Sequence, residues 1–127
     1  MFPRPPIILY VERNQMLLQT VRDVLEFAGW YVKPCQEAFR ARAILQYREY
    51  FDLLLIDNEL SSISGLELIG HIRRVPHRQQ IPIILISLED LSEEAIQAGA
   101  NAFLRKPNNL IDLVDTIRRL LAPPADA

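Results

Sequence analysis

The sequence predicts a single α/β domain built on a doubly wound, five-stranded, mostly parallel sheet in the order 2-1-3-4-5. Five strand-sized apolar runs alternate with segments that repeat apolar residues at helical spacing. Several of the runs, IILYV, LLLI and IPIILI, are apolar without a break. Unbroken apolar strands are typical of a parallel sheet that helices cover on both faces. The 127 residues suffice for one domain and leave little room for a second.

The five runs lie at residues 7–11, 31–35, 53–56, 81–86 and 102–104. Pro34 in the second run cannot donate a hydrogen bond to a neighbouring strand, so this strand is expected at an edge of the sheet. An edge position is also what the order 2-1-3-4-5 requires of the second strand.

Four of the intervening and following segments place their apolar residues on one helical face. Asn108 or Asn109 is expected to cap the last of these helices. The apolar positions are Leu17, Val21, Val24, Leu25 and Ala28; Ala38, Ala41, Ile44 and Leu45; Leu66, Leu68, Ile69 and Ile72; and Leu110, Ile111, Val114, Ile117, Leu120 and Leu121.

Composition excludes several kinds of site. The formal net charge of −2 and the absence of a Lys/Arg block disfavour direct binding of nucleic acid. Cys35 is the only cysteine, which rules out an internal disulfide and, with only His71 and His77 beside it, a zinc cluster. A reducing cytoplasm is the expected location, because no apolar run approaches the roughly 20 residues that span a bilayer and the first residues lack a signal-peptide core.

The boundaries follow from the same patterns. Residues 7–121 are expected to form the domain, residues 1–6 an N-terminal extension, and residues 122–127 (APPADA) a tail or the start of a linker. The stretches HIRR and PHRQQ are expected to form a solvated helix end. The sequence leaves open whether the chain is complete or part of a longer protein.

Chemically useful side chains follow the predicted strands. In doubly wound sheets the ligand crevice lies beyond the carboxyl ends of the strands, at the switch point beside strands 1 and 3. Two carboxylates, a hydroxyl and an amine are therefore expected to converge at this edge. The residues that follow the strands are Glu12, Arg13 and Asn14; Asp57, Asn58 and Glu59; Ser87 and Leu88; and Arg105, Lys106 and Pro107.

This ordered set resembles the response-regulator receiver family of two-component signalling, the CheY-like superfamily, from residue 7 to about residue 121. The resemblance implies a flavodoxin-like (βα)5 fold and matches residues one by one. Glu12 matches the first strand-1 acid, Asp57 in DLLLIDNEL the phosphorylated aspartate, and Ser87 the strand-4 hydroxyl. Lys106 in FLRKP matches the family's lysine before a cis-proline. Gly65 in SGLEL matches the turn glycine, and Phe103 in GANAFL matches the aromatic switch residue.

The family's chemistry gives these residues roles. Asp57 would attack the phosphoryl group, Lys106 would balance charge, and Ser87 would donate a hydrogen bond to a phosphoryl oxygen. Ser87 and Phe103 would be the moving parts of the switch. The resemblance also implies a Mg²⁺ site made by Glu12, Asp57 and the backbone carbonyl of Glu59.

Several positions depart from the family pattern. Arg13 replaces the second strand-1 acid, so Mg²⁺ should bind weakly. Arg13 is expected to pair with Asp57 or Glu12 in place of the metal, the alternative being a solvated side chain at the helix start. Leu88 stands where a small residue leaves room for the phosphoryl donor. Glu59 and Glu89 occupy positions that in the family tune the lifetime of the phosphoryl group, and two acids there could repel phosphate or guide water. The fourth helix, within LEDLSEEAIQAG, should be shortened by about one turn.

Two hypotheses compete. In the first, the chain is a cytoplasmic phosphoprotein of a phosphorelay, with Mg²⁺ as cofactor. It receives a phosphoryl group on Asp57 from a histidine kinase or phosphotransfer protein and signals through contacts with a downstream partner or attached effector. Its chemistry would be limited to self-phosphorylation and autodephosphorylation. The fourth helix, fifth strand and fifth helix would form the output face and a possible homodimer contact.

In the second hypothesis the chain is a degenerate receiver, an interaction or dimerisation module that needs neither phosphorylation nor Mg²⁺ because Arg13 replaces a metal-binding acid and mimics the neutralised state. A third option, a small doubly wound enzyme, has no glycine-rich phosphate loop to support it.

Overall fold

The structure is a computed structural model that describes residues 4–122. Its centre is a five-stranded sheet in the order β2-β1-β3-β4-β5, and every neighbouring pair is parallel. The predicted fold class and strand order are confirmed. The strands are β1 (Ile7–Val11), β2 (Tyr31–Cys35), β3 (Leu53–Asp57), β4 (Ile83–Ser87) and β5 (Ala102–Arg105).

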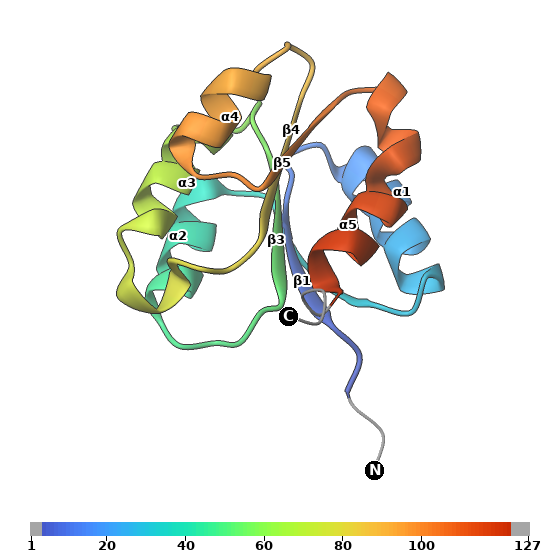
Figure 1. Ribbon diagram of the computed structural model, residues 1–127, viewed down its shortest axis with the longest axis horizontal. Helices are drawn as coiled ribbons and strands as arrows, with labels where there is room; N and C mark the ends of the chain where they lie inside the picture. The colour runs from blue at the N-terminus through green and yellow to red at the C-terminus, as the bar shows by residue number, and fades with distance from the viewer. Residues whose placement is uncertain (1–3, 123–127) are drawn as a thin grey trace, which may run out of the picture.

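Five α-helices cover the two faces of the sheet: α1 and α5 lie on one side, and α2, α3 and α4 lie on the other (Figure 1). No helix within residues 4–122 is both long and apolar enough to cross a bilayer. The expected extension and tail fall largely on residues 1–3 and 123–127, outside the described residues. The helices are α1 (Gln15–Phe27), α2 (Ala38–Gln46), α3 (Gly65–Arg73), α4 (Ser92–Ala98) and α5 (Leu113–Leu121), with short 3-10 helices η1 (Pro76–Arg78) and η2 (Asn108–Asp112).

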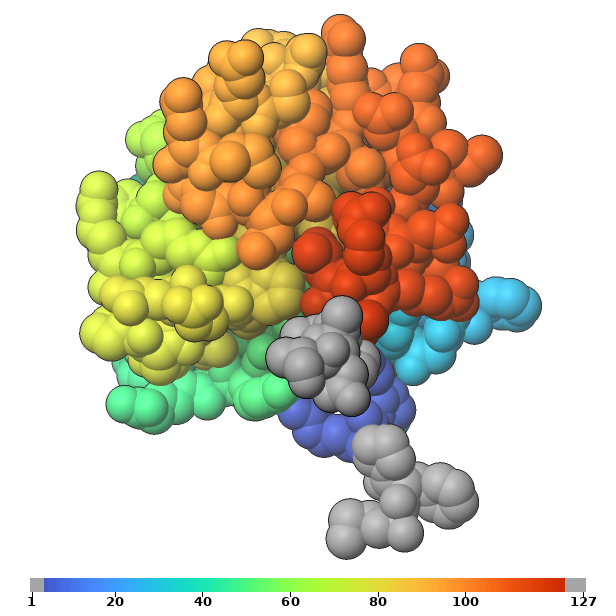
Figure 2. Space-filling model, viewed as in Figure 1, coloured from blue at the N-terminus to red at the C-terminus, as the bar shows by residue number. Residues whose placement is uncertain are grey.

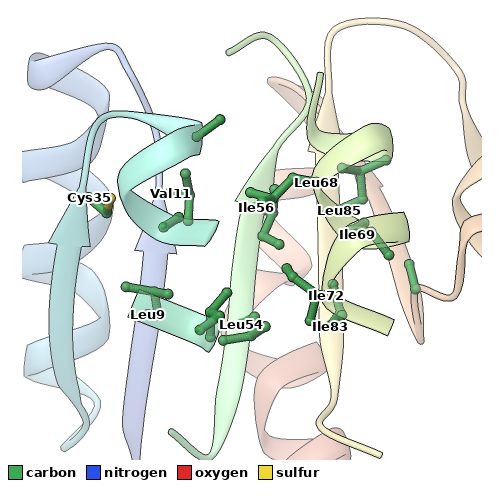
Figure 3. Packing of buried hydrophobic residues seen from close by; sticks show 14 of the residues in the cluster. Leu9, Val11, Cys35, Leu54, Ile56, Leu68, Ile69, Ile72, Ile83 and Leu85 are labelled. Carbon is green, nitrogen blue, oxygen red and sulfur yellow. The ribbon is translucent and has the colours of Figure 1, made fainter. Parts of the chain in front are cut away.

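The core consists of two apolar layers, one on each face of the sheet. Successive residues of a strand point to opposite faces, so the unbroken apolar strands supply both layers. Figure 3 shows the layer in which Leu54 and Ile56 of β3 pack against Leu68 and Ile72 of α3. Cys35 is buried in this layer. Burying each such side chain contributes about 1.5–3 kcal/mol.

The outer strand β2 is the edge that Pro34 predicted. The N–H of Tyr31 donates to the carbonyl of Pro6 (2.9 Å), and the carbonyl of Cys35 accepts from the N–H of Glu12 (2.9 Å). The odd-numbered residues of β2 therefore direct their backbone groups toward β1. Pro34, which has no N–H, falls on the outward side, where a missing donor costs nothing.

Two predictions about where an element begins were wrong. β4 begins at Ile83 and not at residue 81, because Pro82 cannot continue the ladder as a donor. Neither Asn108 nor Asn109 caps α5: these residues form η2, and the side chain of Asn109 accepts the N–H of Arg105 (3.1 Å). The helix begins at Leu113 instead.

Arg78, in the PHRQQ stretch expected to be solvated, is buried. Its guanidinium donates to the carbonyls of Leu45 (3.1 Å) and Tyr47 (2.8 Å) at the end of α2. These are carbonyls that a helix C-terminus leaves without intrahelical partners. Arg78 is therefore a structural residue that closes α2.

The fourth helix is short, as predicted, with seven residues. It ends at Ala98 and is capped by Gly99, whose backbone lies in the left-handed region (φ 113°) that favours glycine. The guanidinium of Arg73 in α3 donates twice to the carbonyl of Gly99 (3.0 and 2.8 Å). This arginine ties the end of α4 to α3.

Candidate functional site

The carboxyl ends of β1, β3, β4 and β5 bring the predicted side chains together at one edge of the sheet. The strand register aligns Asp57 with Ile86 and Ser87 with Arg105, so the ends of β3, β4 and β5 lie side by side. The site is largely enclosed, because Asp57, Glu12 and Ser87 are buried and the Lys106 side chain is only 11% exposed.

Asp57 is the last residue of β3 and is fully buried. Its Oδ1 accepts the backbone N–H of Glu59 (2.7 Å), which closes a tight turn after the strand. Its Oδ2 accepts a hydrogen bond from the ammonium group of Lys106. The Asp57 carboxylate is therefore fixed in position by a backbone donor and a cation.

Within residues 4–122, Lys106 is the only ammonium group that pairs with these carboxyl groups. Besides Asp57, its Nζ lies 3.4 Å from Oε1 of Glu59 and 4.0 Å from Oε1 of Glu12. Burial disfavours the charged amine, but the neighbouring carboxylates outweigh burial and raise the pKa of Lys106. The peptide bond from Lys106 to Pro107 is cis, as the resemblance implied.

Glu12 is the least satisfied group of the site. Its Oε2 accepts the N–H of Asn14 (2.9 Å), whereas Oε1 has no hydrogen-bond partner. Burial, followed by the neighbouring Asp57 carboxyl, raises the pKa of Glu12 to about 8; the Asn14 N–H and the Lys106 charge oppose this shift. A proton on Glu12 would let it donate a hydrogen bond to Asp57.

We expect Glu12→Gln to stabilise the domain in a pH-dependent way. A raised pKa means that the folded state holds a proton which the unfolded state releases above its ordinary pKa of 4.5. The contribution of Glu12 to the stability of the wild type should therefore fall as the pH rises from 4.5 to about 8, whereas glutamine does not titrate. At about 1.4 kcal/mol per pKa unit, even half of this shift gives roughly 2 kcal/mol.

Urea denaturation across this pH range measures the effect. The advantage of Glu12→Gln should be smallest at low pH and greatest above pH 8. A stability difference that stays constant with pH would show that Glu12 titrates normally.

The Glu59 side chain makes contacts that sequence reasoning did not predict. Its Oε2 accepts the hydroxyl of Ser87 (2.6 Å), and its Oε1 accepts the N–H of Leu88 (2.9 Å). Burial favours the neutral acid, but the donors from Ser87 and Leu88 and the Lys106 charge prevail and lower the pKa of Glu59. The predicted strand order could have indicated this contact. Because β3 and β4 are neighbours, an acid two residues after β3 lies near the serine that ends β4.

Arg13 does not take the position that we expected. Its side chain is exposed, and among residues 4–122 it forms no ion pair with Asp57 or Glu12. Its carbonyl accepts the side-chain amide of Gln36 (3.0 Å). The predicted ion pair was wrong because Lys106 already neutralises the buried acids, and an exposed guanidinium keeps its hydration.

The remaining predicted residues surround the cluster. Gly65 lies directly against the backbone of Asp57, and Phe103 is half-buried against the core layer of α3. Leu88 is exposed beside Ser87, and Glu89 is exposed while its N–H donates to the hydroxyl of Ser87 (3.1 Å).

The donor set fits a metal ion poorly in this arrangement. Both carboxylate oxygens of Asp57 and of Glu59 accept hydrogen bonds, and Arg13 stands where a second strand-1 acid would be needed. Of the carboxylate oxygens of Glu12, Asp57 and Glu59, Oε1 of Glu12 is the one that has no hydrogen-bond partner among the described residues. Among the described residues, no three His, Cys, Asp or Glu side chains are arranged to hold a metal. A magnesium ion would have to displace existing donors.

The fold and this cluster define a flavodoxin-like α/β domain with a carboxylate–lysine–serine site at its carboxyl edge. A family model described as the response regulator receiver domain matches residues 8–118. The chain belongs to the response regulator receiver family of two-component signalling. Receiver domains are generally signalling modules and not enzymes.

Relatives support this assignment. The alginate biosynthesis transcriptional regulatory protein AlgB of Pseudomonas putida is 35% identical over 101 residues, which are 79% of this chain and 22% of AlgB. The chemotaxis response regulator CheY4 of Vibrio cholerae has a TM-score of 0.84 at 26% identity, covering 92% of this chain and 99% of that one. The receiver domain of the sensor histidine kinase PA1611 from Pseudomonas aeruginosa, solved with a magnesium ion in its active site cleft, has a TM-score of 0.82 at 26% identity, covering 92% and 98%.

Proposed function

We propose that Asp57 accepts a phosphoryl group in a phosphorelay and that the domain passes on the change through protein contacts. The observation that carries this proposal is the fixed Asp57 carboxylate, which lies at the carboxyl edge of the sheet with the Lys106 ammonium on it and the Ser87 hydroxyl on the neighbouring strand. A carboxylate, a cation and fixed donors are what phosphoryl transfer to an aspartate requires.

In the proposed reaction a carboxylate oxygen of Asp57 forms a bond to phosphorus, while the bond from phosphorus to the donor's nitrogen or oxygen breaks and its electron pair leaves with the donor. Lys106 balances the charge that gathers on the phosphoryl oxygens. The Ser87 hydroxyl and the Leu88 N–H, which in the structure donate to the Glu59 carboxylate, would in the proposed reaction donate hydrogen bonds to those oxygens.

The proposed donor is a histidine kinase or a phosphotransfer protein. The proposed output face comprises α4, β5 and α5, whose orange and red segments lie side by side on the face seen in Figure 2. Exposed apolar side chains on or beside these elements, Ile96 (58%) and Ile111 (86%), would contact a downstream partner, an attached effector or a second copy.

A second candidate function, a receiver that works without phosphorylation, is favoured by two observations. The carboxylate of Glu59 already accepts the hydrogen bonds that a phosphoryl group would need, and Arg13 replaces a metal-binding acid. Such a domain would be a constitutive interaction or dimerisation module.

Incubation with acetyl phosphate, with and without Mg²⁺, separates these candidates. The proposal expects a phosphoryl adduct by mass spectrometry that is absent from Asp57→Asn. Arg13→Asp restores an acid and should increase the labelling in Mg²⁺. A wild type that stays unlabelled while Arg13→Asp is labelled would support the second candidate. Equal, Mg²⁺-dependent labelling of both proteins would show that Arg13 does not weaken the site.

A further inference from the structure

The carboxylate of Glu59 is held like a bound anion. Three donors from two other segments meet it: the Ser87 hydroxyl at 2.6 Å, the Leu88 N–H at 2.9 Å and the Lys106 ammonium at 3.4 Å. Both carboxylate oxygens are used, Oε2 by Ser87 and Oε1 by Leu88 and Lys106. A hydroxyl, a backbone N–H and an ammonium group are donors that also suit a phosphate-class oxyanion.

These donors are arranged independently of Glu59. The peptide group that carries the Leu88 N–H is fixed through its carbonyl, that of Ser87, which accepts the backbone N–H of Lys106 (2.8 Å). The hydroxyl of Ser87 is oriented by the N–H of Glu89 (3.1 Å), and Lys106 is held by Asp57. The donor cluster would therefore persist if the Glu59 side chain left.

Glu59 can leave without unfolding the site. Its backbone is anchored by its N–H to Asp57, but its side chain is 27% exposed, more than that of Lys106. Rotation of the side chain into water would cost its three contacts and restore its hydration. Charged side chains at a solvent boundary gain little net energy from such contacts, so displacement by a stronger anion is feasible.

We propose that Glu59 is an internal ligand that fills the oxyanion site formed by Ser87, Leu88 and Lys106, and that external phosphate-class anions must displace it. The Glu59 carboxylate acts as a competitor built into the chain. It determines how readily the site admits an oxyanion, and in the context of the proposed function, on which this second step rests, it slows phosphoryl transfer to Asp57.

Titration with inorganic phosphate tests the occupancy directly, with the backbone amide resonance of Leu88 as the reporter. Glu59→Gln keeps the size of the side chain but removes its charge, and Glu59→Ala empties the position. Both variants should bind phosphate about tenfold or more tightly than the wild type, with a saturable shift of the Leu88 resonance. Dispersion of the remaining amide resonances confirms that each variant is folded.

Asp90→Asn is the matched control. Asp90 is an exposed acid three residues after Ser87, and asparagine can still accept the hydrogen bonds that Oδ1 takes from Ser92. This change removes the same charge from the neighbouring loop without opening the three donors. A gain in phosphate affinity as large as that of Glu59→Gln would mean that general charge is responsible, and the proposal would fail.

Labelling rates with acetyl phosphate complete the test. Faster labelling of Asp57 in Glu59→Gln than in the wild type is expected. If phosphate binds more tightly to the Glu59 variants but Asp57 is never labelled, the competitor role stands and the proposed function falls. If all variants bind phosphate equally and are labelled at equal rates, the proposed function stands and the competitor role is wrong.

Discussion

Lys106→Met is expected to lower the free energy of unfolding by about 3–5 kcal/mol at neutral pH, because it leaves buried acids without their shared cation. Lys106 lies within 4.0 Å of three carboxyl groups, those of Glu12, Asp57 and Glu59, and two of these residues are buried. Methionine preserves most of the apolar stem of the lysine, so packing should change little. Urea or guanidinium denaturation of both proteins gives the difference.

Lys33→Met is the matched control for this prediction. Lys33 also forms an ion pair, with Glu49 at 2.7 Å, but the side chains are 40% and 46% exposed. Because exposed pairs contribute roughly 0–1 kcal/mol, this substitution should be nearly neutral. Similar losses of unfolding free energy in the two variants would mean that Lys106 stabilises the buried cluster no more than an exposed ion pair stabilises the surface.

Gly65→Ala is expected to destabilise the domain by about 3 kcal/mol and to disturb the Asp57 site. A Cβ at this position would lie 2.5 Å from the carbonyl oxygen of Asp57, 2.8 Å from Cα of Asn58 and 2.9 Å from Cδ1 of Leu85. Two of these atoms belong to the backbone and cannot rotate away, so α3 or the turn after β3 must move. Thermal or urea denaturation measures the loss.

Gly70→Ala, in the same helix, provides the comparison. A Cβ at Gly70 would meet nothing within 4 Å, and alanine in a helix interior is favoured over glycine by roughly 0.5–1 kcal/mol. This variant should therefore be slightly more stable than the wild type. If Gly65→Ala were as stable as the wild type, the close approach of α3 to the Asp57 turn would not constrain residue 65.

Much of the fold followed from local patterns. The second strand was predicted at residues 31–35 and is observed there, because its apolar residues and the edge-directing Pro34 agree. The same reasoning placed Asp57 and Ser87 at the carboxyl edge, since parallel strands end together. Gly65 was matched by motif, and its contact with the Asp57 backbone gives a physical reason for the glycine.

The contacts that the sequence did not predict all depend on the direction that a long side chain takes. Arg13 was expected over the buried acids, yet it points to solvent while Lys106 takes their charge. Arg78 was expected in solvent, yet it is buried on the carbonyls that end α2. Glu59 was expected to contribute its backbone carbonyl and to tune the phosphoryl group, but the contact of its side chain with Ser87 was not foreseen. Such choices rest on desolvation and on competing partners far along the chain, which residue spacing does not encode.

The backbone groups on the outward side of β2 affect whether two copies of this domain can join their sheets. An exposed strand edge invites a strand of another molecule when it offers an uninterrupted series of donors and acceptors. Here Pro34 removes a donor from the free side of a five-residue strand, and the neighbouring Lys33 adds a charge. Extending the sheet into a second molecule at this border is thus disfavoured, and crowded solutions of the domain are protected from fibre-like stacking along it.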